Sequence, residues 1–272
     1  MSKLYQSRRK ALRKNNDMHI LLFITLWSCI AFLPQASCQP ETIKVTTTRA
    51  IATVLNEIGT EFEKNAGHKL SITNDIAIRM VRRIQSGEAF DLLVASPEQI
   101  DTLIKQGKII PQTKTILARS GIGVAVRAGA EKPDISSIES FKKALLNAKS
   151  IAYLKEGQSG IYLDELIRKL GLADTLRSKI VRPDTDIVSE LVAKGEVELG
   201  LVVITQIQTT PGVELVGPLP KEIQSFAVFV AGVSTNSKSP AASKELIKFL
   251  TGPQSVKVMK LQGMQPAIEF VK

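Results

Sequence analysis

Two kinds of hydrophobic pattern alternate along the chain after residue 40. Short runs rich in β-branched residues predict strands, and stretches with apolar residues every three or four positions predict amphipathic helices. The predicted strands cover residues 42–46, 69–73, 90–95, 120–127, 151–154, 199–204, 213–216 and 226–230. Two predicted helices end near Gly67 and Gly87, and a third begins at Pro97. Four more cover residues 138–148, 162–170, 187–194 and 241–250.

This order of elements predicts an α/β fold. Strands and helices alternate with short glycine-containing links, which is typical of mostly parallel sheets flanked by helices. The link at residues 128–134 is rich in turn-forming residues, and a second α/β series follows it. Two series joined by strands predict two lobes with a cleft between them, where α/β proteins bind small ligands.

One stretch, residues 150–162, combines an apolar run, a glycine-rich turn and the start of a helix. Apolar residues then follow at helical spacing, and Gly171 ends the pattern as a C-cap. The first backbone N–H groups of this helix, around Gln158, Ser159 and Gly160, have no intrahelical partner and lie at the positive end of the helix dipole. They form a candidate anion site, and an ordinary strand-to-helix connection is the alternative interpretation.

The first 38 residues have the three parts of a secretory signal. Six basic residues precede an apolar run at residues 20–33, and small residues follow it. The run is too short for a comfortable membrane span. We expect cleavage after Cys38, whereas cleavage before Cys38 would leave a lipidated N-terminus and a membrane anchor. Translation from Met18 in place of Met1 would give a shorter leader.

The predicted leader changes the interpretation of the charge. The formal net charge is +10. The six basic residues and Asp17 of the leader account for +5, which leaves about +5 on the mature chain. This mild charge, without interleaved aromatic residues, argues against nucleic acid as a partner. Both cysteines, Cys29 and Cys38, belong to the leader, so we expect neither a disulfide nor thiol chemistry in the mature protein.

The residues also argue against catalysis. Gly157 to Ile161 resembles a hydrolase nucleophile elbow around Ser159, but the fifth position is Ile161 where that pattern requires glycine. A catalytic triad needs a histidine base, and the mature chain holds only His68, which we expect on the surface in a helix-to-strand turn. No cysteine, histidine or carboxylate spacing suits a metal site. We therefore expect no enzymatic activity, no cofactor and no metal.

The order of several short motifs resembles a known family. These motifs begin at Ile43, Leu55, Glu61, Gly67, Arg83 and Phe90, and they continue at Gln158, Ala193, Gly200 and Leu250. Together they resemble the extracellular solute-binding proteins of ABC importers typified by periplasmic molybdate-binding proteins. The resemblance implies an ABC permease and ATPase as partners. From the secretory signal we expect the protein in the periplasm, and we expect it to be a monomer. It implies lobe I at residues 42–126 plus 224–272 and lobe II at residues 127–223.

The resemblance also implies a set of ligand-binding positions. They are Arg49, Ala50, Ala77, Ile78, Arg79, Ser159, Gly160, a helix-start position that falls at Ile187 or at the preceding Asp186, and Val203. Ala50 and Ala77 stand where the family has serines, and Val203 lies near a tyrosine position. Three hydroxyl ligands are therefore missing, while a guanidinium has appeared at Arg49.

This change predicts a different ligand. Losing buried donors costs about 1–3 kcal/mol each, which would weaken a tetrahedral oxyanion site. A guanidinium instead matches a carboxylate with two parallel hydrogen bonds. We therefore hypothesise that Arg49 and Ser159 hold an organic di- or tricarboxylate. The alternatives are molybdate or tungstate binding, and ligand sensing without transport.

Other charged residues near the predicted cleft have plainer interpretations. The alternative to ligand binding by Arg49 is a structural role or a position facing solvent. Arg79 can belong to a solvated helix face with Arg82 and Arg83. We expect Asp186 to cap the following helix, because a carboxylate at the cleft would repel an anion.

Overall fold

The computed structural model describes residues 40–271, so the expected leader and its cysteines lie outside the described residues. The strands are β1 Thr42–Thr47, β2 Lys69–Asn74, β3 Leu92–Ala95, β4 Thr115–Arg127, β5 Ile151–Ala152, β6 Ile180–Val181, β7 Leu199–Val203, β8 Val213–Pro218, β9 Phe226–Val233 and β10 Gln265–Pro266. The helices are α2 Arg49–Ala66, α3 Ala77–Gln85, α4 Pro97–Lys105, α5 Ile138–Asn147, α6 Gln158–Lys169, α7 Ala173–Leu176, α8 Val188–Ala193, α9 Ile204–Thr209, α10 Pro240–Leu250 and α11 Pro253–Leu261.

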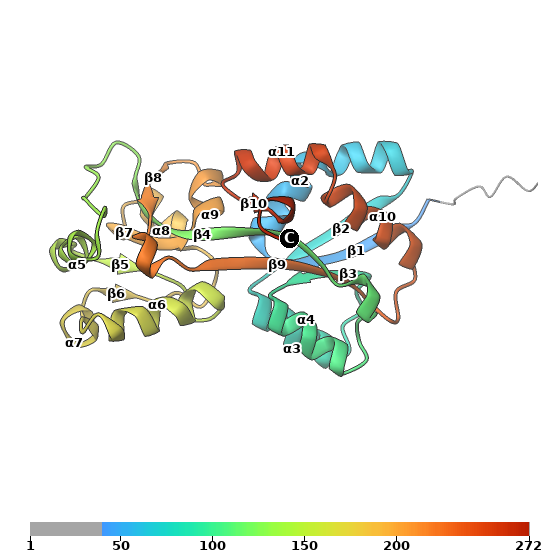
Figure 1. Cartoon of the computed structure of the whole chain (residues 1–272), viewed down its shortest axis with the longest axis horizontal. Helices are drawn as coiled ribbons and strands as arrows, with labels where there is room; N and C mark the ends of the chain where they lie inside the picture. The colour runs from blue at the N-terminus through green and yellow to red at the C-terminus, as the bar shows by residue number, and fades with distance from the viewer. Residues whose placement is uncertain (1–39, 272) are drawn as a thin grey trace, which may run out of the picture. The chain divides into compact units, whose positions relative to one another are not determined.

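The strands follow the order β2-β1-β3-β9-β4-β7-β5-β6, with β8 and β10 also paired to β4 (Figure 1). The outer strands pair in parallel, β1 with β2 and β3, and β5 with β6 and β7. The long strands β4 and β9 add antiparallel pairs in the middle. The structure is therefore two parallel βαβ series joined through an antiparallel centre.

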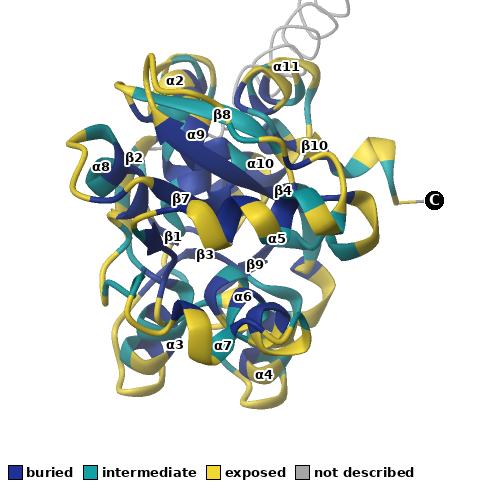
Figure 2. Ribbon diagram, turned by 90° about the vertical axis from the view of Figure 1, so that its left-hand side faces the viewer, coloured by how far each residue is buried: buried dark blue, intermediate teal, exposed yellow. Residues whose placement is uncertain are grey.

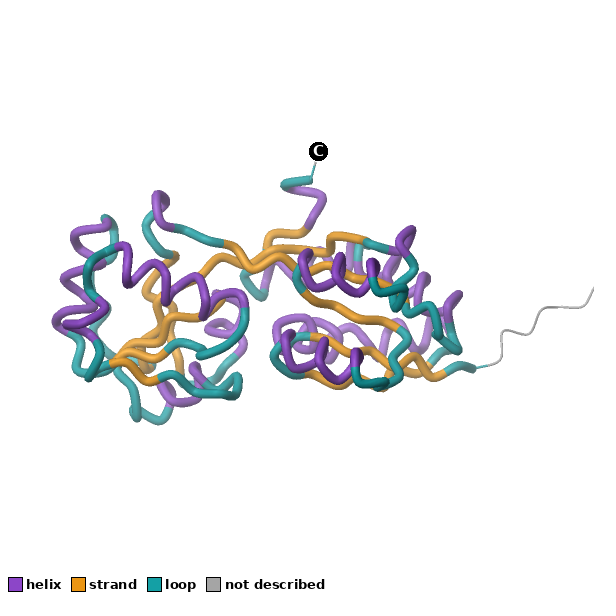
Figure 3. The backbone as a smooth tube through the Cα atoms, turned by 90° about the horizontal axis from the view of Figure 1, so that it is seen from below, coloured by secondary structure: helices purple, strands orange, loops and turns teal. Residues whose placement is uncertain are grey.

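Strand β4 is shared by the two halves. Residues Thr115–Gly121 pair with β9, and from Ile122 onward the strand pairs with β7. The Gln224 side chain fixes this change of partner, because its amide accepts from the Ile122 N–H and donates to the Ile122 carbonyl, both at 3.0 Å. Figure 3 shows these strands bridging the two halves, called lobe I and lobe II below. The residue boundaries expected for the lobes stay a prediction.

Buried residues lie mainly on the strands and on parts of the helices (Figure 2), and each sheet face has its own hydrophobic core. In lobe I, α2, α10 and α11 cover one face of the sheet, and α3 and α4 cover the other. In lobe II, α5, α6 and α7 cover one face, and α8 and α9 cover the other. Every residue of β3 is buried, as its continuous apolar run predicts. The strands and helices of both lobes are therefore packed against hydrophobic cores.

The structure differs from the expected elements at several ends. β4 begins at Thr115, earlier than residue 120, and α6 begins at Gln158, earlier than residue 162. The pattern missed α9 because that helix has six residues, two of them β-branched isoleucines and two threonines. It missed α11 because only Ser255 and Met259 of this helix are buried, so its apolar stripe is weak.

The expectation of a surface histidine is wrong. His68 is 2% exposed, and its Nδ1 accepts from the Glu41 N–H at 3.3 Å. Its ring lies 6.5 Å from the ring of Phe62, under the helix-to-strand turn. His68 is thus a core residue of lobe I. None of the helices within residues 40–271 has the length and hydropathy to cross a membrane.

Candidate functional site

A hollow of about 400 Å³ lies where the two lobes meet. Lobe I lines it with the first residues of α2, α3 and α4, and lobe II lines it with the start of α6 and with residues around α8 and α9. The lining residues are Thr48, Ala50, Asp75, Ile76, Ala77, Ile78, Ala95, Ser96, Glu98, Gln99, Leu154, Gly157, Gln158, Ser159, Ile161, Asp186, Val203, Gln206, Ala227, Val228 and Phe229. We call this space the interlobe hollow.

Helix starts give the interlobe hollow its hydrogen-bond donors. The first N–H groups of a helix lack intrahelical acceptors and carry partial positive charge. The N-caps of α2, α3 and α6 make no side-chain cap hydrogen bond, so these N–H groups stay available. Only α4 is closed by a capping box, formed by Ser96 and Gln99. Three open helix starts from two lobes thus lie around one space.

The geometry of α6 depends on two glycines. Gly157, the N-cap, has φ +98°, a left-handed conformation that favours glycine. A Cβ on Gly160 would lie 2.2 Å from the carbonyl oxygen of Leu154. Gly160 therefore lets the helix start approach the end of β5 closely. This contact presents Gln158 and Ser159 to the interlobe hollow.

The structure brings some of the expected site residues together and leaves others outside. Ala50, Ala77, Ile78, Ser159 and Val203 line the interlobe hollow. The residues that do not line it are Arg49, Arg79, Gly160 and Ile187.

Arg49 instead bridges the lobes. Its guanidinium forms an ion pair with Glu190 of α8, and Nη1 donates to the carbonyl oxygen of Asp186 at 2.7 Å. Burial lowers the pKa of Arg49, but the hydrogen bond and charge of Glu190 raise it overall. Arg49 lines a neighbouring hollow of about 380 Å³ that shares Asp75 and Asp186 with the interlobe hollow. The Arg49 guanidinium thus contacts lobe II in this structure. Its expected hydrogen bonds to a ligand stay a prediction.

Arg79 makes a similar bridge. Its Nη2 donates to the carbonyl oxygen of Asp184 in lobe II. Arg83 instead pairs with Asp75 at 2.5 Å and with Glu88 at 2.7 Å, and Arg82 is exposed. The three arginines of α3 therefore do not form one solvated face.

The expectation that Asp186 caps a helix is wrong. The N-cap of α8 is Ile187, and no side chain caps this helix. The Asp186 carboxyl lines the interlobe hollow, where its Oδ2 accepts from Gln206 Nε2 at 2.5 Å. Burial raises the pKa of Asp186 to about 6, although the nearby Arg49 charge opposes this shift. No periodicity marks this residue in the sequence, because its position depends on α9, which the pattern missed.

Sequence reasoning also missed Thr48. Its side chain lines the interlobe hollow, and its buried Oγ1 has no hydrogen-bond partner in the described chain. Ser96 and Ser159 add hydroxyls to the same space. These groups partly offset the hydroxyls that Ala50 and Ala77 lack. The run Thr46-Thr47-Thr48 at the end of β1 was the available signal.

Apolar walls, neutral hydrogen-bond donors and three carboxyl groups line the interlobe hollow. Among the lining residues in the described chain there is no lysine or arginine. Carbon-rich side chains from both lobes form the walls, and they include Ile76, Ile78, Leu154, Ile161 and Phe229. The acidic lining residues are Asp75, Glu98 and Asp186.

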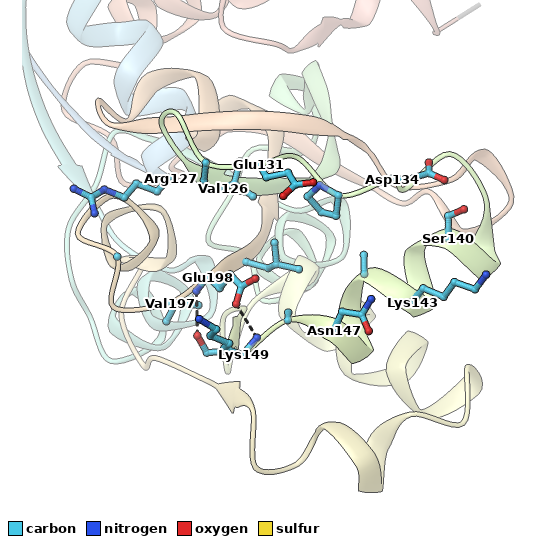
Figure 4. Close-up of a pocket in the computed structure, with 17 residues that line it drawn as sticks. Val126, Arg127, Glu131, Asp134, Ser140, Lys143, Asn147, Lys149, Val197 and Glu198 are labelled. Carbon is cyan, nitrogen blue, oxygen red and sulfur yellow. Dashed lines mark hydrogen bonds between the residues drawn. The ribbon is translucent and has the colours of Figure 1, made fainter.

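A second, larger hollow of about 770 Å³ lies on lobe II, between α5 and the link after β4 (Figure 4). Charged side chains of both signs surround it, including Arg127, Glu131 and Lys143. Glu198 is engaged there, because its Oε2 accepts from the Lys149 N–H at 2.7 Å. Ser140 in the first turn of α5 lines this hollow, and the side chain of Ser137 caps that helix. Within residues 40–271, no three side chains of metal-ligand type cluster together.

Comparison with known proteins agrees with this architecture. Residues 43–265 match the family model described as bacterial extracellular solute-binding protein. The structure superimposes on the periplasmic molybdate-binding protein of Azotobacter vinelandii with a TM-score of 0.69 at 21% identity, over 82% of this chain and 98% of the other. The two-lobed periplasmic-binding-protein fold expected from the sequence is confirmed.

The proteins related to this chain by sequence include one named as an enzyme and others named as binding proteins. One, named aconitate isomerase, from Pseudomonas sp., is 28% identical over 87% of this chain and 93% of its own length. Another, the molybdate-binding protein ModA of Escherichia coli strain K12, is 26% identical over 81% of this chain and 88% of its own length. The first name is that of an enzyme. It overturns the expectation that this chain performs no chemistry.

Proposed function

The chain belongs to the family of bacterial extracellular solute-binding proteins, and from this premise we propose that its interlobe hollow binds a small organic polycarboxylate of the aconitate type. The observation that carries this proposal is the pairing of apolar walls with open helix starts. Carboxylates bind well at helix N-termini, and a carbon skeleton gains free energy from contact with apolar walls. Molybdate has no carbon skeleton and therefore gains no such free energy from contact with the apolar walls.

The volume of the interlobe hollow supports an organic ligand. At ~30 Å³ for each water-sized oxygen, a tetrahedral oxyanion fills roughly 120 Å³. The interlobe hollow measures about 400 Å³, within the range typical of small-molecule sites. A small tricarboxylate is larger than a tetrahedral oxyanion, and helix starts of both lobes line the space that it would occupy.

The donors come from both sides of the cleft. The starts of α2 and α3 with Thr48 serve lobe I, and the start of α6 with Ser159 serves lobe II. Each open helix start carries roughly half a positive charge. Arg49 adds a full charge next to the interlobe hollow, partly neutralised by Glu190. A ligand that contacts both lobes stabilises the arrangement in which they meet.

The family is described as bacterial and extracellular, which supports our proposal that the protein is located in the periplasm. The partners that follow are an ABC permease and ATPase that receive the bound anion. The related molybdate-binding proteins support this assignment by sequence and fold.

Isomerisation of the bound ligand is a second candidate function. It is favoured by the relative named aconitate isomerase and by the ionisable Asp186 carboxyl on the wall of the interlobe hollow. Capture and isomerisation need the same recognition of a polycarboxylate. A ligand screen therefore tests the feature that they share.

A thermal-shift screen of the mature protein tests the proposal. The panel comprises cis- and trans-aconitate, a saturated tricarboxylate, a dicarboxylate, molybdate and sulfate. A ligand at about 100 times its Kd adds about 2.7 kcal/mol of stability, which raises the melting temperature measurably. We expect tricarboxylates to raise it and molybdate to leave it unchanged. The reverse pattern contradicts the proposal.

A further inference from the structure

The Asp186 carboxyl is held in a fixed position on the wall of the interlobe hollow. Gln206 Nε2 donates to its Oδ2 at 2.5 Å, and Arg49 Nη1 donates to its backbone carbonyl at 2.7 Å. No group in the described part of the chain donates a hydrogen bond to Oδ1. One carboxylate oxygen is therefore oriented by α9 while the other has no protein donor.

The groups that face Asp186 come from several elements. They are Arg49 at the start of α2, Glu190 of α8, Gln206 of α9 and Asp75 after β2. Glu190 is already paired with Arg49. Asp75 is also engaged, because its Oδ1 accepts from the Ile76 N–H at 2.7 Å and its Oδ2 pairs with Arg83 at 2.5 Å.

The remaining acidic residue of the lining is less suited to proton transfer. Glu98 is exposed in the first turn of α4, and no hydrogen bond or ion pair within residues 40–271 fixes the position of its carboxylate. Asp186 therefore differs from the other acids of the interlobe hollow: its carboxyl is partly buried, is oriented by Gln206, and forms no ion pair with a cationic side chain in the described chain.

We propose that Asp186 is a catalytic residue that removes and returns a proton in an allylic isomerisation of an unsaturated polycarboxylate bound in the interlobe hollow. This inference rests on the proposed binding of such a ligand. A general base works best when its pKa lies near the working pH. Burial, which raises the pKa of Asp186 to about 6, brings it into that range.

The step balances without a cofactor. The Asp186 carboxylate takes a proton from the methylene carbon between the double bond and a carboxylate, so a C–H bond breaks and an O–H bond forms. The electron pair spreads over the allylic carbons and the adjacent carboxylates, and the open helix starts stabilise its charge. The protonated Asp186 carboxyl exchanges its proton with solvent and then delivers a proton to the far allylic carbon. The double bond moves by one carbon and can take either geometry, with no net oxidation.

The test combines binding with proton exchange in the mature protein. Calorimetry measures the affinity for trans-aconitate. Proton NMR in deuterated buffer follows conversion to the cis isomer and deuterium entry at the methylene and vinyl carbons. Asp186→Asn keeps the shape and removes the base. Asp184→Asn is the matched control, because the exposed Asp184 carboxylate pairs with Lys155 outside the interlobe hollow.

We expect wild type and Asp184→Asn to bind, isomerise and exchange. Asp186→Asn should lose about a hundredfold or more in rate while its Kd changes by less than about tenfold. A variant that keeps the wild-type rate overturns the role of Asp186. A wild type that binds but neither isomerises nor exchanges also overturns it and leaves the binding function intact. Absence of any binding by wild type overturns both.

A measurement on wild type guards against a variant that fails to fold. If Asp186 is the base, the rate should rise with pH to a plateau, with an inflection near its pKa of about 6. A rate that is flat between acidic and neutral pH overturns the proposal without any substitution.

Discussion

Arg49, the first residue of α2, forms an ion pair with Glu190 of α8, and this pair joins the two lobes beside the interlobe hollow. Both side chains are partly buried, with 26% and 33% of their surfaces exposed. Glu190 Oε2 is buried without a hydrogen-bond partner in the described chain. The pair therefore holds a carboxylate close to a space in which we propose that anions bind.

Replacing Arg49 should weaken ligand binding. Arg49→Ala leaves the negative charge of Glu190 uncompensated near the ligand, and we expect the Kd for a tricarboxylate to rise by about tenfold or more. Calorimetry measures this change. The control is Arg82→Ala, which removes an exposed arginine from the neighbouring helix and should leave the Kd unchanged. Equal affinities for wild type and Arg49→Ala would show that the pair has no role in binding.

A double variant separates two roles for Arg49. If the arginine acts by neutralising Glu190, then Arg49→Ala combined with Glu190→Gln should recover most of the lost affinity. If the guanidinium leaves Glu190 and grips the ligand directly, the double variant stays as weak as Arg49→Ala. We expect recovery, because the structure shows the guanidinium turned to lobe II.

Thr48 should contribute to binding but not to folding. Thr48→Val keeps the shape and removes a buried hydroxyl that has no partner in the described chain. We expect the affinity to fall by about 0.5–1.5 kcal/mol, while stability without ligand is unchanged or higher. Thr48→Ser retains the hydroxyl and should retain the affinity. A loss of stability in Thr48→Val would indicate a structural role instead.

Asp186 should make stability depend on pH. Its pKa in the folded protein, about 6, lies above its ordinary value of 3.8, so the folded state binds the proton more strongly. Its contribution to stability is therefore complete below about pH 4 and is lost as pH rises through 6, by up to about 3 kcal/mol. Asp186→Asn removes this pH-dependent loss of stability. Denaturant unfolding at several pH values should show that the free energy of unfolding of the variant rises relative to that of wild type between pH 4 and 7.

The same experiment has a direct comparison. Asp184→Asn, in the same segment, should follow the wild-type pH profile, because the Asp184 carboxylate is largely exposed. Parallel curves for Asp186→Asn and wild type would contradict the assigned burial of Asp186.

Gly160→Ala tests how α6 is positioned. The added Cβ would lie 2.2 Å from the Leu154 carbonyl oxygen, and backbone must move to relieve the clash. We expect a loss of about 1–3 kcal/mol in stability, together with weaker binding as the start of α6 shifts. Gly217→Ala in β8 is the control, since its nearest contact would be an ordinary 3.5 Å from Ile135. Wild-type stability in Gly160→Ala would mean that the contact is looser than the structure shows.

The sequence predicted the elements that have a strong local pattern. The spacing of apolar residues alone predicts the buried strand β3 and the amphipathic helix α2. The glycine-rich turn from Gly157 to Gly160 predicts the start of α6. These features are local because each depends on neighbouring residues along the chain. The two-lobed fold also followed from the order of the strands and helices.

The side chains of the site were less predictable, because their positions depend on contacts distant in sequence. Asp186 faces the interlobe hollow through its contacts with Arg49 and Gln206, from α2 and α9. Arg49 turns to Glu190, which lies far along the chain. Neither contact leaves a periodic trace. The position of a helix start was therefore predictable, while the direction of a charged side chain beside it was not.

The central claim is that the interlobe hollow recognises an organic polycarboxylate. Isothermal titration calorimetry of the mature protein with trans-aconitate, and separately with molybdate in the same buffer near pH 7.5, tests it most directly. We predict saturable binding of trans-aconitate at one site and no measurable heat of binding for molybdate. Saturable binding of molybdate without binding of trans-aconitate would contradict the claim and would mean that the open helix starts alone select the ligand.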